Sequence, residues 1–168
     1  TYKLKTLTST YVLRAKPPGE LLKSAHAVDR EYRVIKALKN TAVAVPKVFF
    51  LADNNDNPLG RMFYIMEYLP GRIFWDPSVP EVDKATRTGL YNSMCQILAD
   101  LHSVDIDKVG LSNFGKPGNY FARQIDRWVK QYRISRLTEE PVMENVITFL
   151  EGSLPPDDGQ ISLVHGDY

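Results

Sequence analysis

Alternating apolar and polar positions predict a small antiparallel sheet near the start of the chain. Residues 10–16 alternate strictly, which places Arg14 and Lys16 together on one face of a strand. Residues 43–51 and 61–68 predict two further strands, and the loop between them is rich in Asp and Asn, as is typical of a hairpin. The sheet is therefore expected to contain at least three strands.

Helical periodicity predicts one helix within this sheet region and three helices after it. Apolar residues recur at helical spacing within 25–39, and Ser24 can cap the first turn of that helix. The same spacing recurs in 83–103, in 121–133 and in a segment entered at Thr138. The chain thus begins as a sheet with one helix and continues as a mostly helical part.

The boundary between these two parts is expected at the turn Leu69-Pro70-Gly71. Strand pairing ends here, because Pro70 has no amide hydrogen and Gly71 permits unusual backbone angles. We therefore divide the chain into an N-terminal lobe of residues 1–69 and a helical lobe of residues 70–168.

The helix expected at 83–103 is long enough to form the spine of the helical lobe. Met94 and Cys95 are most simply explained as part of its core. Cys95 is the only cysteine, so the chain can form no internal disulfide. We therefore expect a reducing compartment and interpret the chain as part of a cytoplasmic protein.

The charges nearly cancel, with 21 Lys and Arg residues against 20 Asp and Glu residues, a net charge of +1. A chain with so little net charge has no overall positive potential that would attract nucleic acid or an anionic membrane. Three scattered histidines and one cysteine offer no zinc-ligand spacing. No stretch reaches the roughly 20 apolar residues of a membrane-spanning helix. We therefore expect no nucleic-acid partner, no structural zinc and no membrane span.

The last eight residues combine a short apolar run with a polar turn. Residues 161–164 predict a buried strand, and His165-Gly166-Asp167 follow it at once. A strand that ends in a glycine turn places the next carboxylate at an edge, where a catalytic acid or base has to be. An ordinary turn explains the same tripeptide, so the case for Asp167 depends on the rest of the chain.

Two further charged features stand out on the expected helices. Glu31 lies beside the apolar stripe of its helix and not on the opposite, solvated face, so its carboxylate needs a cation. The second feature is a basic strip on the helix 121–133, formed by Arg123, Arg127, Lys130 and Arg133. The strip could meet an anionic substrate, but a solvated helix face explains it more simply.

These features follow one another in the order of a kinase fold. A strand with a cation precedes a helix with a half-buried acid, the run Met-Glu-Tyr-Leu-Pro-Gly, a helical part and His-Gly-Asp. On these residues the sequence resembles the aminoglycoside-phosphotransferase and choline-kinase branch of the protein-kinase-like fold. The stretches Tyr-Val-Leu-Arg, Leu-His-Ser-Val-Asp and Trp-Val-Lys-Gln-Tyr-Arg make it similar, more narrowly, to the phosphotransferase-like domain joined to acyl-CoA dehydrogenases.

The resemblance implies an α+β fold with an antiparallel-sheet lobe that carries one helix, and a mostly helical second lobe, truncated at both ends. It also implies a phosphate site, in which an ion pair of Arg14 and Glu31 positions the α- and β-phosphates of ATP. Most kinases have Lys where Arg14 stands, and Lys16 is the fallback cation. The alternative is a solvated Glu31, with Tyr32 filling the stripe.

The resemblance further implies that adenine docks on the backbone between Met66 and Leu69. The Glu67 carbonyl and the Leu69 amide are the expected partners, since Pro70 has no amide hydrogen to donate. An ordinary strand exit, ended by Pro70 and Gly71, is the alternative.

Asp167 is the catalytic base that the resemblance implies, and His165 is assigned to packing beneath its loop. Magnesium ligands are expected after Tyr168, with none inside the segment. The implied activity is ATP- and Mg²⁺-dependent phosphoryl transfer to a small-molecule hydroxyl. The substrate suggested by the fusion is a hydroxylated acyl-CoA, and the suggested partner is an acyl-CoA dehydrogenase domain. The alternative is a catalytically silent module that binds nucleotide or acyl-CoA as a docking domain.

Overall fold

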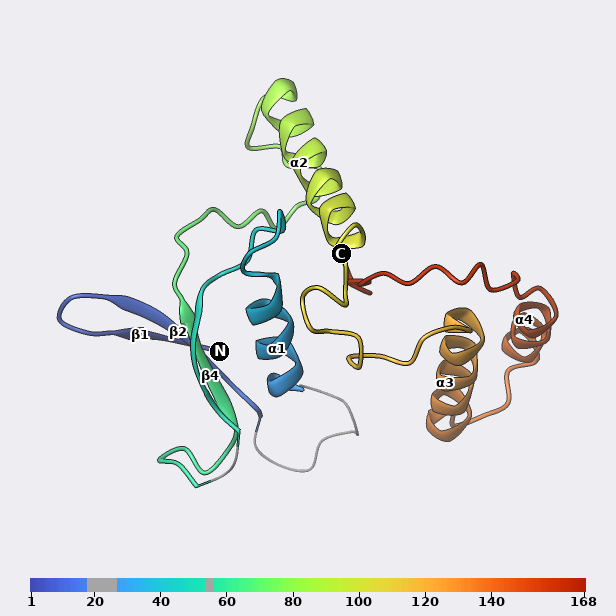
Figure 1. Cartoon of the computed structure of the whole chain (residues 1–168). Coiled ribbons are helices and arrows are strands. Elements are labelled where there is room, and N and C mark those ends of the chain that lie inside the picture. The colour runs from blue at the N-terminus through green and yellow to red at the C-terminus, as the bar shows by residue number, and fades with distance from the viewer. Residues whose placement is uncertain (18–26, 54–55) are drawn as a thin grey trace. The chain divides into compact units, whose positions relative to one another are not determined.

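The computed structural model describes residues 1–17, 27–53 and 56–168, and these contain one four-stranded sheet and four α-helices (Figure 1). This composition confirms the predicted α+β class. The strands are β1 (Tyr2–Lys5), β2 (Thr10–Ala15), β3 (Val48–Ala52) and β4 (Phe63–Glu67), and the helices are α1 (Val28–Leu38), α2 (Lys84–His102), α3 (Tyr120–Ser135) and α4 (Pro141–Gly152).

The sheet has the strand order β1-β2-β4-β3, and every neighbouring pair is antiparallel. β3 and β4 form the hairpin that the sequence predicts, and β4 lies in the interior of the sheet beside β2. In the ladder between β2 and β4, Tyr11 is opposite Glu67 and Arg14 is opposite Tyr64. This register places Arg14 and Tyr64 directly opposite each other on the two central strands.

Strand β1 is not among the predicted elements. Its sequence, Tyr-Lys-Leu-Lys, does alternate, but four residues are too few for such a pattern to distinguish a strand. The hairpin to β2 closes through a local turn, in which the Thr6 amide donates to the Ser9 carbonyl at 2.8 Å. The Ser9 amide in return donates to the Thr6 hydroxyl at 3.0 Å.

The two faces of the sheet have different partners. One face carries a small core of Leu13, Ala52 and Phe63. Helix α1 packs against β3 and β4 and lies beside β4 in Figure 1. The ends of its stripe, Val28 and Leu38, are only 1% and 3% exposed. Burying each of them contributes about 1.5–3 kcal/mol, which holds the helix on the sheet.

Two helix starts differ from the sequence expectation. Helix α1 begins at Val28, later than residue 25, and the expected cap Ser24 lies outside the described residues. Helix α4 begins at Pro141 and not at Thr138. Proline fits the first helical turn because its missing amide hydrogen would have no partner there, so the extended Glu140 becomes the residue before the helix.

The prediction of a strand at residues 161–164 is wrong. These residues carry no strand assignment, and Ile161 and Val164 are 55% and 52% exposed. The apolar run suits a strand, but no described segment pairs with it, and without a partner its backbone cannot form a ladder.

The expected core of helix α2 is also wrong in part. The apolar stripe is present, with Leu90, Ile97, Leu98 and Leu101 half-buried, but no residue of the helix is buried. Met94 is 44% exposed and Cys95 is exposed too. Helical spacing identifies an apolar face, but it cannot tell how much of that face its neighbours cover.

The described chain separates into two compact units. One contains Thr1–Ser112 together with Ser162–Tyr168, and the other contains Asn113–Ile161. The first unit holds the sheet, α1, α2 and the His-Gly-Asp segment, and the second holds α3 and α4. The lobe boundary at residue 69 remains a prediction.

Candidate functional site

A two-point ion pair joins Arg14 on β2 to Glu31 on α1. Arg14 Nε donates to Glu31 Oε2 at 3.0 Å, and Arg14 Nη2 donates to Glu31 Oε1 at 3.1 Å. Both side chains are about one third exposed, at 35% and 32%. The hydrogen bonding of the guanidinium to the Glu31 carboxylate is the main cause that raises the pKa of Arg14. The predicted ion pair is therefore confirmed, and a solvated Glu31 is excluded.

Local structure explains why these two groups meet. The alternation of β2 turns Arg14 toward the face that α1 covers, while Leu13 turns to the opposite core. On α1, Glu31 lies one turn after the buried Val28 and next to Tyr32. Lys16, the fallback cation, lies beyond the end of β2 and is exposed, and among the described residues it makes no ion pair.

Tyr64 completes this cluster, although no pattern in the sequence points to it. Its hydroxyl donates to Glu31 Oε2 at 3.3 Å, and its side chain is 2% exposed. Burial, followed by the charge of Glu31 and their hydrogen bond, raises the pKa of Tyr64 to about 12. The phenol therefore stays protonated near neutral pH and remains a donor to the carboxylate.

The expected adenine-docking segment begins at the end of β4. The Glu67 amide donates to the Lys47 carbonyl at 2.8 Å, and the Glu67 carboxylate accepts from the Lys47 amide at 3.1 Å. Leu69 follows the strand and is 57% exposed, and within the described ranges no protein acceptor pairs with its amide. The docking of adenine on this segment remains a prediction.

The His-Gly-Asp turn lies at the exposed end of the chain. Gly166 has φ of +83°, a left-handed conformation that suits glycine, and the Asp167 amide donates to His165 Nδ1 at 3.3 Å. The Tyr168 hydroxyl donates to the Met94 carbonyl of α2 at 2.6 Å. Asp167 is exposed. His165 is exposed as well, so its predicted packing beneath the loop is wrong.

The structure brings some of the predicted site residues together and leaves others apart. Arg14 and Glu31 form one cluster, with Tyr64 added. Throughout the described part of the chain, no hydrogen bond or ion pair joins Asp167 to that cluster. The described residues also contain no group of three or more His, Cys, Asp or Glu side chains that could hold a metal ion. The described side chains therefore offer no such ligand group for Mg²⁺.

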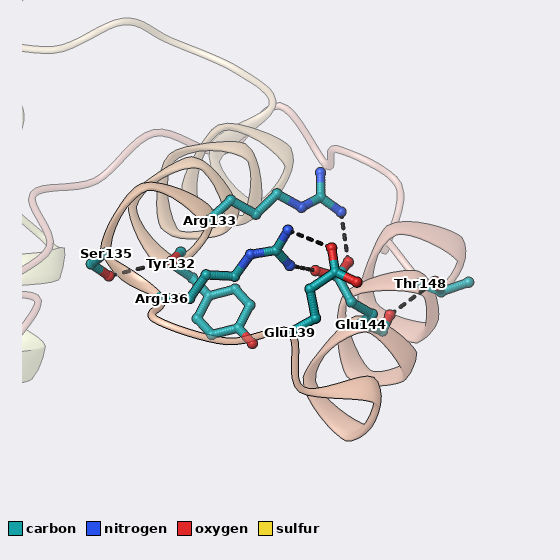
Figure 2. Close-up of polar contacts among 7 residues, drawn as sticks. All are labelled: Tyr132, Arg133, Ser135, Arg136, Glu139, Glu144 and Thr148. Atoms are coloured by element: carbon teal, nitrogen blue, oxygen red, sulfur yellow. Dashed lines mark hydrogen bonds and ion pairs between the residues drawn. The ribbon is translucent and has the colours of Figure 1, made fainter.

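Two of the four residues of the basic strip on α3, Lys130 and Arg133, are paired with carboxylates of the same unit. Figure 2 shows Arg133 and Arg136 reaching the carboxylate of Glu144 on α4, at 2.9 and 2.6 Å. Lys130 is paired with Asp126 at 2.8 Å. These contacts favour the simpler explanation, a solvated helix face.

The comparisons with known proteins decide the family. A model described as the phosphotransferase enzyme family matches residues 1–168, the whole chain. The chain belongs to this family. A crystal structure from Ralstonia eutropha, named as a candidate aminoglycoside phosphotransferase, agrees with the present structure with a TM-score of 0.84 at 45% identity. The match covers 99% of this chain and 48% of that one, and it confirms the predicted kinase-like fold.

The curated relatives are much longer proteins. "Probable acyl-CoA dehydrogenase IBR3" of Arabidopsis thaliana is 48% identical over 166 residues, which cover 94% of this chain and 20% of the relative. "Acyl-CoA dehydrogenase family member 10" of Mus musculus is 44% identical over 168 residues, which cover 100% of this chain and 16% of the relative. The present chain thus spans a fifth or less of either relative. In the residues that the structure describes, no helix has the length and apolar character needed to cross a membrane.

Proposed function

We propose that this chain carries the nucleotide-binding residues and the catalytic base of an ATP-dependent phosphotransferase that acts on a small-molecule hydroxyl. The observation that carries the proposal is the two-point pair of Arg14 and Glu31. In kinases, an ion pair between a cation on the sheet and a carboxylate on the helix holds the cation in position to bind the nucleotide phosphates. Membership of the phosphotransferase family supports the same chemistry.

The Arg14 guanidinium still has donors for a phosphate. Glu31 occupies the Nε hydrogen and one Nη2 hydrogen, and Nη1 donates to the Thr1 hydroxyl at 3.1 Å. A guanidinium has five N–H donors, so two have no partner in the part of the chain that the structure describes, and the side chain is 35% exposed. A planar cation of this kind suits the α- and β-phosphates of ATP. Adenine would dock on the backbone from Met66 to Leu69.

Asp167 would act on the acceptor hydroxyl. The hydroxyl oxygen attacks the γ-phosphorus, the bond from that phosphorus to the β–γ bridging oxygen breaks, and ADP leaves. The hydroxyl proton passes to the Asp167 carboxylate, and the products are ADP and a phosphate monoester. The exposed position of Asp167 in a glycine turn supports this role, because a general base must reach its substrate.

A hydroxylated acyl-CoA is the substrate that we propose. The curated relatives carry acyl-CoA dehydrogenase names, and the present chain matches only a small part of each. A dehydrogenase domain in the same protein would then act on the same class of molecule, and it is the partner that we propose.

The test is a phosphoryl-transfer assay on the full-length protein. Purified protein is incubated with ATP, Mg²⁺ and a hydroxylated acyl-CoA, and the phosphorylated acyl-CoA and ADP are measured by mass spectrometry. The matched control is an acyl-CoA of the same chain length without the hydroxyl. We expect transfer to the hydroxylated substrate alone. Nucleotide binding without transfer to any hydroxyl would refute the enzyme and favour a silent docking module.

A further inference from the structure

Within the described residues, the carboxylate of Glu31 accepts three hydrogen bonds, and one of them does not come from Arg14. The two Arg14 bonds use both carboxylate oxygens. The Tyr64 hydroxyl adds a third bond to Oε2 at 3.3 Å. Arg14 and Tyr64 occupy opposite positions on neighbouring strands, so their side chains approach Glu31 from the same face of the sheet.

The Tyr64 side chain is held firmly enough to fix this carboxylate. It is 2% exposed, and its ring lies 6.0 Å from the ring of Tyr32, between ring centroids. Tyr32 belongs to α1, next to Glu31, so the phenol rests against the same helix that carries the carboxylate. A buried ring with packed neighbours has few alternative rotamers.

The fixed orientation of the Glu31 carboxylate matters more for an arginine at position 14 than it would for a lysine. An ammonium group is a rotatable point charge, whereas a guanidinium is planar and presents its free N–H groups only along fixed directions. Because Arg14 binds Glu31 with two parallel hydrogen bonds, the plane of the Glu31 carboxylate sets the plane of the guanidinium. The orientation of the Glu31 carboxylate therefore determines the direction of the remaining Arg14 N–H groups.

We propose that Tyr64 is a positioning residue for the nucleotide phosphates, which orients Glu31 and through it the free donors of Arg14. The proposal rests on the proposed function. Tyr64 touches neither ATP nor the reacting atoms in this account. Its hydroxyl fixes a carboxylate that would otherwise rotate together with the arginine.

The discriminating experiment compares ATP with adenosine as ligands of the full-length Tyr64→Phe protein. Phenylalanine keeps the ring and its packing but removes the donor to Glu31. We expect the dissociation constant for ATP to rise about 3- to 10-fold, because one hydrogen bond to a charged group is lost. Adenosine has no phosphates, so its dissociation constant should be unchanged. Both ligands are titrated by calorimetry at one fixed Mg²⁺ concentration.

Tyr32→Phe is the matched control, because it removes a neighbouring phenol that makes no hydrogen bond to Glu31 among the described residues. It should leave both dissociation constants unchanged. If Tyr64→Phe binds ATP as the wild type does, or weakens ATP and adenosine equally, the positioning role is refuted while the proposed function stands. If the wild type binds neither ligand, the proposed function fails, and the role of Tyr64 fails with it.

Discussion

Arg14 on β2 and Tyr64 on β4 lie opposite each other in the antiparallel ladder, and both donate to the carboxylate of Glu31. One side chain of α1 is thereby tied to the two central strands of the sheet. The helix can move away from the sheet only if these hydrogen bonds break. A phosphate site of this kind needs such a connection between helix and sheet, because the helix acid must hold the sheet cation in place.

Glu31→Gln should weaken ATP binding more than it weakens the fold. Solvent screens a pair that is one third exposed, so its loss should lower the free energy of unfolding by only about 1 kcal/mol. The dissociation constant for ATP should rise about 10-fold, because Arg14 loses the carboxylate that orients it. Urea unfolding and ATP titration measure the two effects.

Glu139→Gln provides the control for this prediction. Glu139 pairs with Arg136 at 3.0 Å, but its side chain is 81% exposed and lies outside the proposed site. The Glu139→Gln substitution should change the free energy of unfolding of the protein by less than about 0.5 kcal/mol and leave ATP binding unaffected. Wild-type affinity for ATP in Glu31→Gln would show that the pair has no part in nucleotide binding.

Leu69→Pro tests the adenine-docking segment. Proline removes the amide hydrogen that adenine is expected to use, so the dissociation constants for ATP and adenosine should both rise, by about 5- to 10-fold. Leu69→Ala retains the amide and shortens only a side chain that is 57% exposed, so it should bind both ligands normally. Equal affinities for the two variants would place adenine elsewhere.

Gly166→Ala should impair catalysis through the backbone. Its φ of +83° is costly for any residue with a Cβ, by about 1–2 kcal/mol, and relief of that strain would displace Asp167. We expect kcat to fall by at least about 10-fold, since small misplacements of a catalytic group are costly, with ATP affinity unchanged. Gly89→Ala is the control, since Gly89 lies in helix α2 with open space around it. An unchanged kcat in Gly166→Ala would argue against a strict requirement for this turn.

Two local patterns and the resemblance to kinases together predict the ion pair. Strand alternation places Arg14 and Lys16 on one face, helical periodicity places Glu31 beside a buried stripe, and the resemblance selects Arg14 as the cation. Tyr64 could not be found in this way. It lies within the strand-forming run 61–68, and only the register of β2 against β4 places it opposite Arg14. Register depends on pairing between distant segments, which no local pattern encodes.

The expectations that failed share a physical cause. The run 161–164, Met94 and Cys95 are apolar or small, so local patterns assign them to a strand or a core. Whether such residues are buried depends on which other segments cover them, and the structure leaves Met94 44% exposed. Local periodicity reports which face is apolar, while burial is a property of the whole arrangement.

The contact between α3 and α4 should depend on pH through Glu144. The hydrogen bond from Arg133 is the main cause that lowers the pKa of Glu144. A lowered carboxyl pKa adds stability above the ordinary value of about 4.3, and that stability is lost as the pH falls toward the lowered value. Glu144→Gln should therefore lower the melting temperature at pH 7 and have a much smaller effect near pH 3.

Glu81→Gln is the control for this pH dependence, because Glu81 is exposed and makes no ion pair within the described part of the chain. Its melting temperature should differ from the wild type by a similar small amount at both pH values. A Glu144→Gln effect of equal size at both pH values would show that the two arginines add no charge-dependent stability.

The proposed role of Asp167 as catalytic base is tested with Asp167→Asn in the full-length protein, supplied with ATP, Mg²⁺ and a hydroxylated acceptor. Asparagine keeps the shape of the side chain but cannot accept the hydroxyl proton. Asp158→Asn is the control, because Asp158 is an exposed turn carboxylate that accepts from the Gln160 amide at 2.9 Å. We expect Asp167→Asn to lower kcat about 10²- to 10⁴-fold with the dissociation constant for ATP nearly unchanged, while Asp158→Asn keeps full turnover. Full turnover by Asp167→Asn would show that Asp167 is not the catalytic base.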